Sequence, residues 1–278
     1  METNPLKQYF RQPAIYVRLP SNGEFYPAGA LDRTANGEYP VLPMTTIDEI
    51  TYRTPDALFN GNAVTSVIQS CMPNIRDAWM IPSIDIDTIL VAIRIASYGH
   101  DMSITTQCPG CQASTDYSVD LRHVMDRIRA PDYQTNLGMG DLEIWFSPMT
   151  YQQMNNNAMT QFEEQKTIQL LQDSDAPDDR KLLELNAMLK KITTATVRAL
   201  SQSISLIKTP AAQVTDQEQI YEWLINCDRV MFNRVRDHVL DLKKTSELQP
   251  LKIKCDQCQK EYEQLFTLDM ANFFAGAS

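Results

Sequence analysis

The sequence predicts an α+β fold dominated by helices, in which short strands form the two halves of a ribbon around four cysteines. Two observations predict the ribbon: the cysteines come in pairs with two intervening residues, and each pair lies between short strand-like segments. A third observation predicts the helices, because apolar residues recur at helical spacing before the first pair and between the pairs. The expected fold is therefore a split four-cysteine zinc ribbon of short strands with a long helical insertion.

The two cysteine pairs have the spacing of metal ligands. Two intervening residues let both sulfurs of a pair point into one small site, and two pairs supply a tetrahedral zinc ion. The flanking residues also match, since Ile104 and Leu251 each lie four residues before a pair, and Val119 and Phe266 each lie eight residues after one. The sequence predicts one structural zinc ion per chain, with these ligands: Cys108, Cys111, Cys255 and Cys258.

Other uses of these thiols remain open at this point. The motif Cys-Pro-Gly-Cys at 108–111 resembles the thiol pair of disulfide oxidoreductases, although that pair follows a strand and opens a helix. Thiols without metal are another alternative, and iron also binds four cysteines. Four thiolates fill a tetrahedral shell and leave no position for water, so the site is expected to be structural. The remaining cysteines, Cys71 and Cys227, are predicted to be small buried apolar residues.

Composition excludes several classes of function. The chain has 278 residues and a formal net charge of −10, whereas a protein that tracks nucleic-acid phosphates needs a basic face. No apolar run approaches the ~20 residues of a membrane-spanning helix. The segment 1–11 is polar and lacks the apolar core of a signal peptide. We therefore expect an intracellular product with neither a nucleic-acid nor a membrane partner.

The pattern along the chain predicts six consecutive segments. They are a turn-rich N-terminal segment with short strands (1–43), a helical subdomain (44–100), the first half of the ribbon (101–122), a short helix and hairpin (123–149), the helical insertion (150–245), and the second half of the ribbon with the C-terminus (246–278).

Start and stop signals place the individual helices. Thr45 or Thr46 is expected to cap a first helix, 55–56 opens a second, and a third runs from a Ser83 cap to Gly99. A short helix at 123–129 is followed by a hairpin with strands at 133–137 and 142–146. The insertion is predicted to hold three long helices, at 151–172, at 178–207 and from a capping box at 215–218 onward.

The chain offers no candidate catalytic site. Its histidines, His100, His123 and His238, are too dispersed in sequence to predict a ligand cluster, and acidic residues such as Asp48 and Asp85 are expected to complement helix N-termini. A glycine-rich phosphate loop and the common hydrolase motifs are absent from the sequence. The tripeptide Pro-Met-Thr precedes a predicted helix at both 43–45 and 148–150, which suggests a weak internal repeat.

The order of motifs in the first half of the chain resembles a known family. The segments 19–27, 42–49 and 85–99, followed by the cysteine pair at 108–111, are similar to the baseplate hub assembly proteins of contractile-tailed, myovirus-type bacteriophages. The resemblance covers residues 15–125, and the second cysteine pair is compatible with it. It implies a non-enzymatic tail component, and the family has no active site to carry over.

Two functions from different classes follow. The first, implied by the resemblance, is a structural or assembly component of the tail baseplate in the hub region. Its partners would be other baseplate, hub and tail proteins, in one or several copies, and it would be assembled in the host cytoplasm and located in the virion. The alternative is a zinc-ribbon adaptor in transcription or nucleic-acid handling. The lysines near the second pair favour that role, but acidic neighbours offset them: Lys252, Lys254, Lys260, Asp256, Glu261 and Glu263.

Overall fold

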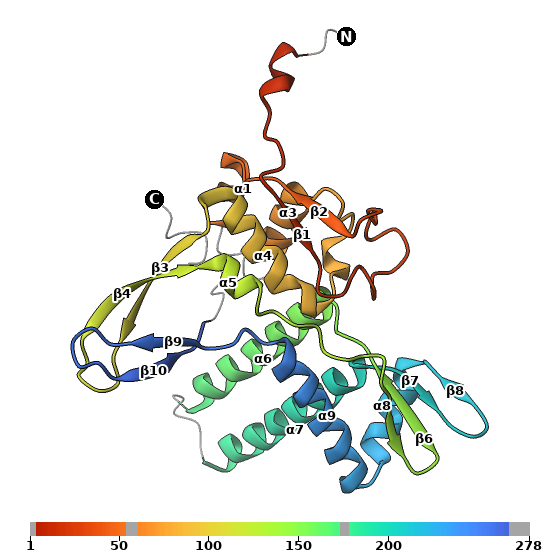
Figure 1. Cartoon of the computed structure of the whole chain (residues 1–278). Helices are drawn as coiled ribbons and strands as arrows, with labels where there is room; N and C mark the ends of the chain where they lie inside the picture. Colours follow the sequence, from red (N-terminus) through yellow and green to blue (C-terminus); the bar gives the residue numbers. More distant parts are fainter. Residues whose placement is uncertain (1–3, 54–60, 173–177, 267–278) are drawn as a thin grey trace. The chain divides into compact units, whose positions relative to one another are not determined.

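A computed structural model describes residues 4–53, 61–172 and 178–266 (Figure 1). The chain divides into two compact units: unit 1 is Met1–Ala130 with Ser246–Ser278, and unit 2 is Pro131–Thr245. The elements are helices and short antiparallel strands. The prediction of a mixed fold dominated by helices is therefore confirmed.

Unit 1 begins with a 3-10 helix, η1 (Pro5–Tyr9), and an antiparallel pair of strands, β1 (Ile15–Arg18) and β2 (Glu38–Val41). Alternate residues of the pair, such as Val17 and Tyr39, are buried, which is the expected pattern for a sheet with one face on a core. The loop between the strands turns at Gly23, where φ is +78° and an added Cβ would lie 3.0 Å from the hydroxyl of Tyr39. Glycine therefore suits this turn on both counts.

The helices of unit 1 pack around the longest of them, α4. They are α1 (Thr46–Tyr52), α3 (Asn62–Cys71), η2 (Ala78–Met80), α4 (Ser83–Tyr98) and α5 (Leu121–Met125). Most of α4 is buried on all sides, including Ile89, Leu90 and Ile93, so this helix supplies much of the core. It ends at Gly99 as predicted. The predicted Ser83 cap is wrong, because Ser83 is already helical and Pro82 precedes the helix without a side-chain cap. The predicted start at 55–56 lies outside the described residues.

Arg11 fixes the chain that enters β1. Its guanidinium donates to the carbonyl of Pro43 at 2.6 Å, to Asp48 Oδ2 at 3.1 Å and to both oxygens of Ser70 at 2.7 Å. Asp48 also completes a capping box of α1 with Thr45, which is one of the two caps that the sequence predicted. Burial raises the pKa of Asp48, but hydrogen bonds from Thr45 and the charge of Arg11 outweigh burial and leave the pKa below its ordinary value.

A buried carboxylate holds the loop after β1 onto α4. Asp85 accepts hydrogen bonds from the backbone N–H of Ser21 at 2.8 Å, from Ser21 Oγ at 2.5 Å and from the hydroxyl of Tyr26 at 3.0 Å. Burial raises its pKa to about 6, partly offset by these three donors. The prediction that Asp85 merely complements the helix N-terminus is therefore incomplete, because its partners lie far away in the sequence.

Replacement of Asp85 by alanine should destabilise unit 1. The change leaves three buried donors without their acceptor, and hydrogen bonds to a charged group contribute about 1.5–3 kcal/mol each. We expect Asp85→Ala to lower the free energy of unfolding in urea at pH 7 by about 3 kcal/mol or more. The matched control is Asp87→Ala on the same helix, whose pKa is raised to about 6 by burial alone. An equal loss in both variants would contradict this role of Asp85.

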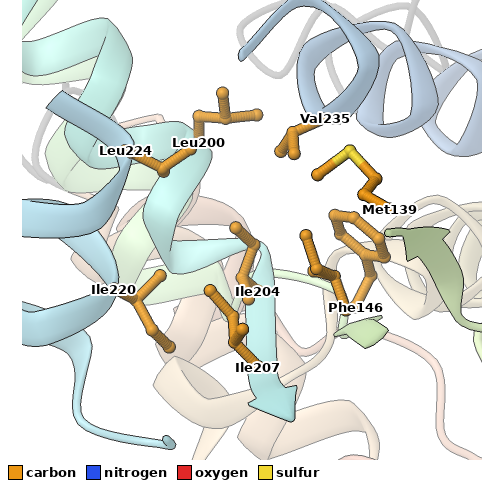
Figure 2. Packing of buried hydrophobic residues seen from close by; sticks show 9 residues of the cluster. Met139, Phe146, Leu200, Ile204, Ile207, Ile220, Leu224 and Val235 are labelled. Atoms are coloured by element: carbon orange, nitrogen blue, oxygen red, sulfur yellow. The ribbon is translucent and has the colours of Figure 1, made fainter. Parts of the chain in front are cut away.

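Unit 2 is built on a four-stranded antiparallel sheet in the order β5-β6-β7-β8. The strands are β5 (Leu137–Met139), β6 (Leu142–Phe146), β7 (Ile204–Lys208) and β8 (Gln213–Val214), and the helices are α6 (Tyr151–Gln172), α7 (Asp178–Gln202), α8 (Gln217–Asn226) and α9 (Arg229–Ser246). Apolar side chains from the strands and from α7, α8 and α9 form one core (Figure 2): Met139, Ile144, Phe146, Leu200, Ile204, Ile207, Ile220, Leu224 and Val235.

The sequence prediction of three long helices in this region is partly wrong. The second helix ends at Gln202, and 204–208 is a strand, because this segment pairs with β6 in the register Ile144 to Ile207. The predicted third helix is divided into α8 and α9, and Asp228 caps α9 by accepting from the N–H groups of Val230 and Met231. The predicted strand at 133–137 begins only at Leu137.

The two Pro-Met-Thr tripeptides start helices in the same way. Thr45 and Asp48 exchange hydrogen bonds between side chain and backbone at the start of α1. Thr150 and Gln153 do the same at the start of α6, at 2.9 and 3.2 Å. Each tripeptide also follows a strand, β2 or β6. The similarity therefore extends to local structure, in which a strand leads into a capped helix.

The core of unit 2 should be sensitive to truncation on its central strand. Ile144 is fully buried on β6, between β5 and β7. Because the site is packed from both sides, Ile144→Ala should lower the free energy of unfolding by about 3 kcal/mol. The control is Leu183→Ala on α7, where the side chain is 71% exposed and the change should be within about 0.5 kcal/mol. Similar losses for the two variants in urea unfolding would refute the assignment of this core.

Candidate metal centre

Two β-hairpins of unit 1 carry the four cysteines. The first is β3 (Asp101–Gln107) with β4 (Ser114–Asp120), and the second is β9 (Leu251–Lys254) with β10 (Glu261–Gln264). Each cysteine pair lies in the turn that joins the two strands of its hairpin. The hairpins lie side by side although the whole of unit 2 separates them in the sequence (Figure 1). This is the arrangement that the matching flanks predicted.

The two turns have the same backbone geometry. In each turn the first cysteine bonds through its N–H and its carbonyl to the residues that close the turn, and the residue after the second cysteine has a positive φ. The hydrogen bonds are 2.8–3.0 Å long and the two φ values are 60° and 61°: Cys108 with Ala113 and Gln112, and Cys255 with Lys260 and Gln259. The cysteine spacing did not predict this role of the two glutamines, although each directly follows the second cysteine of a pair.

The four sulfur atoms form one compact cluster. All four Sγ atoms lie within 4.8 Å of one another. Across the hairpins, Cys108 Sγ is 3.6 Å from Cys258 Sγ, and Cys111 Sγ is 3.7 Å from Cys255 Sγ. A zinc ion with bonds of ~2.3 Å to four sulfurs at tetrahedral angles requires separations of about 3.8 Å. The thiols are free, and their spacing fits such an ion.

The four cysteine residues are buried to different extents. Cys108 and Cys255 are buried, with 1% and 0% of their surfaces exposed, whereas Cys111 and Cys258 are exposed. The first member of each pair therefore faces the protein, and the second lies at the surface. An added Cβ at Gly110 would lie 2.8 Å from Lys260 Cδ and 3.6 Å from Cys258 Sγ, so a small residue allows the first turn to approach the second hairpin closely.

Backbone N–H groups and neighbouring thiols shift the pKa values of two of the cysteines. The N–H groups of Cys111 and Gly110 point at Cys108 Sγ and lower the pKa of this thiol to about 6. At Cys258 the N–H of Lys260 lowers the pKa, but desolvation and the neighbouring thiols outweigh it and raise the pKa to about 11. Thiols packed this closely resist ionising together, and a cation between them removes that repulsion. The four thiols could therefore hold a metal ion.

Direct contacts join the two hairpins beside the cysteines. The hydroxyls of Thr106 and Tyr262 are 2.9 Å apart, and the hydroxyl of Tyr117 donates to the carbonyl of Lys254 at 3.1 Å. Thr106 and Ile253 are buried at 5% and 7% exposure. The spacing of the cysteines gave no signal for these tyrosine contacts, because they depend on which hairpin faces meet.

The histidines do not join the cluster, as the sequence predicted. His100 is half-buried beside Asp101, and His123 is exposed beside Asp120. His238 belongs to unit 2, where its ring lies 4.6 Å from that of Phe146 and burial lowers its pKa. Among the residues that the structure describes, the group suited to hold a metal ion consists of the four cysteines alone.

The geometry also bears on the other interpretations of the thiols. A redox pair of the oxidoreductase type begins a helix after a strand, whereas both pairs here lie in hairpin turns. A basic ribbon face for nucleic acid is also missing on the second hairpin, since Lys254 lies opposite Glu261 and Lys252 opposite Glu263. Cross-strand charges of opposite sign compensate each other locally.

Comparison with known proteins agrees with this arrangement. The family model described as T4 bacteriophage base plate protein matches residues 37–275. The chain belongs to this family. The matched range includes both cysteine pairs and the whole of unit 2, so the relationship extends well beyond the motifs of the first half. Comparisons with curated proteins and with solved structures give no match.

Membership in the family indicates where the protein is located and which kind of partners it has. It is a baseplate protein of a myovirus-type phage, which implies a location in the virion tail and other tail proteins as partners. Among the described residues, no helix combines the length and apolar content needed to cross a lipid bilayer. The resemblance that the motifs suggested is therefore confirmed at the level of the family.

Loss of one buried thiol should destabilise the protein more than loss of a thiol elsewhere. The free energy of binding a metal ion at the four thiols would add to the free energy of folding, so Cys255→Ser should lower the free energy of unfolding by about 3 kcal/mol or more. The matched control is Cys227→Ser, whose thiol belongs to unit 2 and is not one of the four clustered thiols. Urea unfolding with zinc present measures both, and a Cys255→Ser variant as stable as the control would contradict a bound ion.

Proposed function

We propose that the protein is a non-enzymatic structural or assembly component of the baseplate hub, whose fold is closed by one structural zinc ion per chain. The ligands of this ion are Cys108, Cys111, Cys255 and Cys258. The observation that carries the proposal is the clustering of four thiols, from hairpins on either side of unit 2 in the sequence, within 4.8 Å of one another. The setting in a baseplate comes from the family.

The ion acts by joining two distant parts of the chain. Unit 2 leaves unit 1 after Ala130 and the chain returns at Ser246, so both ends of the insertion lead to the two hairpins. Closing a loop of this length has an entropic cost that grows slowly with length, and a metal clip offsets it. The contacts of Tyr117 and Tyr262 are too few to do so alone, because a hydrogen bond contributes only about 1 kcal/mol net.

Zinc is proposed over other ions because of the ligand type and the geometry. Four cysteine thiolates in a tetrahedron are a common structural zinc site, and they fill the coordination shell. With the shell filled, the metal has no position for a substrate or an activated water, which supports a structural role over a catalytic one. Iron shares the preference for four thiolates, and elemental analysis separates the two.

The location at the hub and the partners follow from the proposed role. Baseplate components act by contacting neighbouring subunits, so the partners are other hub, baseplate and tail proteins. Assembly takes place in the host cytoplasm before the tail is complete. The adaptor role in transcription or nucleic-acid handling gains no support from the second hairpin, where lysines and glutamates alternate in opposite pairs.

Metal content and assembly test this proposal together. Elemental analysis of the purified chain should find one zinc per chain, and a chelator should lower its thermal stability. In phage that lack the native gene product, Cys108→Ser with Cys255→Ser should abolish assembly of baseplates, whereas Cys227→Ser should restore it.

Two results would count against the proposal separately. Normal baseplates from the double variant would exclude a clamp that assembly needs. A zinc-loaded protein that is absent from hub complexes, when baseplate intermediates are separated and probed, would keep the metal site and refute the hub role.

A further inference from the structure

Helices α6 and α7 of unit 2 form an antiparallel hairpin (Figure 1). The side-chain amide of Asn157 donates to Gln202 Oε1 at 3.1 Å. Further along the hairpin, Lys191 Nζ lies 3.7 Å from Glu164 Oε1. These contacts fix the line along which the helices meet. It runs through positions spaced three or four apart, most of them partly buried: Asn157, Gln161, Glu164 and Ile168 on α6, and Leu185, Met188, Ile192, Ala195 and Ala199 on α7.

One face of this hairpin carries no charge on either helix. A residue one position after a contact residue lies about 100° further around its helix. In an antiparallel pair, these positions lie on the same face, because a two-fold axis perpendicular to the pair exchanges the helices. The exposed residues at these positions are all apolar or neutral, and together they are called the neutral face: Ala158, Phe162, Gln165, Gln169, Asn186, Leu189, Thr193 and Thr196.

The charged residues of the hairpin lie on its other sides. Among the side chains described at 151–169 and 183–202, they occupy contact positions or the one or two positions before them: Glu163, Glu164, Lys166, Glu184, Lys190, Lys191 and Arg198. Charged residues make up 22% of the whole chain, so an exposed face that spans two helices and holds none is unusual for this protein. The neutral face therefore has the charge depletion that is typical of the core of an interface.

The neutral face is suited to contact with another apolar surface. Phe162 is 51% exposed and Leu189 is 50% exposed. The hydroxyls of Thr193 and Thr196 donate to carbonyls of their own helix at 2.9 and 2.8 Å, so these donors are already satisfied. Helices in proteins owe most of their stability to packing of an apolar face. In the described part of this hairpin, the buried residues lie only at its base: Tyr151, Leu200 and Ser201.

The size of the hairpin matches what a stable dimer requires. Helix α6 has 22 residues and is therefore about 33 Å long, and two helices side by side are about 20 Å across. One face of the hairpin offers roughly 650 Å² per copy, so two such faces would bury roughly 1,300 Å² in total. Specific interfaces bury about 1,200–2,000 Å². A second hairpin of the same size is therefore sufficient to form one.

The absence of charge indicates which partner covers the face. In a two-fold contact the same patch meets itself, so a charged residue near the axis would face its own like charge. A face for a different protein is not restricted in this way. The chain has a formal net charge of −10, so two copies can approach closely only where charge is absent.

We infer that the neutral face packs against the neutral face of a second copy of this chain about a two-fold axis. The two hairpins then form a four-helix bundle, in which Phe162 and Leu189 supply apolar contacts and the glutamines and threonines surround them. This surface belongs to unit 2, whereas the cysteine cluster belongs to unit 1. The inference therefore goes beyond the proposed zinc clamp and does not depend on it.

Sedimentation equilibrium of the purified full chain tests the inference. The native chain should dimerise at micromolar concentrations, and Leu189→Glu should raise the dissociation constant by about tenfold or more, because two buried like charges would oppose each other. The matched control is Leu183→Glu on the same helix, where the side chain is 71% exposed and lies off the neutral face. Its dissociation constant should equal that of the native chain.

A mixing experiment separates a second copy from any other partner. Thr193→Glu and Thr193→Lys should each weaken the dimer, and an equal mixture of the two variants should restore it through opposite charges on the two faces. Both variants should keep the native helix content in circular dichroism, since this side chain is exposed. A native chain that stays monomeric at its highest soluble concentration, equal effects of Leu189→Glu and Leu183→Glu, or a mixture that stays monomeric would each overturn the inference.

Discussion

The contact between two hairpins that unit 2 separates in the sequence is the constraint on which unit 1 depends. One hairpin follows α4 directly, and the other follows α9, so their meeting makes unit 1 a discontinuous unit. Beside the cysteines, the hairpins share hydrogen bonds of Tyr117 and Tyr262. Small structures with little apolar core are commonly held by metals or disulfides. The four thiols occupy the place where such a link is needed.

Polar side chains also hold the N-terminal segments of unit 1 in place. The N-terminal chain and the loop after β1 wrap around helices without long stretches of regular structure. Arg11 makes five hydrogen bonds or close polar contacts to residues distant in sequence. Asp85 accepts three hydrogen bonds from such residues. These directed contacts hold both segments onto the helices. Such buried polar groups contribute specificity because other arrangements leave them without partners.

Local signals could be predicted from the sequence, and long-range pairing could not. The cap of α1 at Thr45 and the end of α4 at Gly99 depend on residues a few positions apart. The spacing within each cysteine pair is also local, and it alone predicts that the two thiols share one site. The sequence predicts a helix through 204–207 because the apolar residues there continue the pattern of α7. Only pairing with β6 makes it a strand. The donors to Asp85 were hidden for the same reason, since they are set by tertiary contact.

The order of segments in unit 1 has a consequence for the synthesis of the protein. Domains generally fold as units while the ribosome delivers them from the N-terminus. Unit 2 is continuous and is complete once Thr245 has been made, whereas β9 and β10 follow it. During the whole translation of unit 2, the first hairpin therefore waits with two unmatched thiols. Unit 1 therefore closes as the last step, after the cysteines of the second hairpin have emerged.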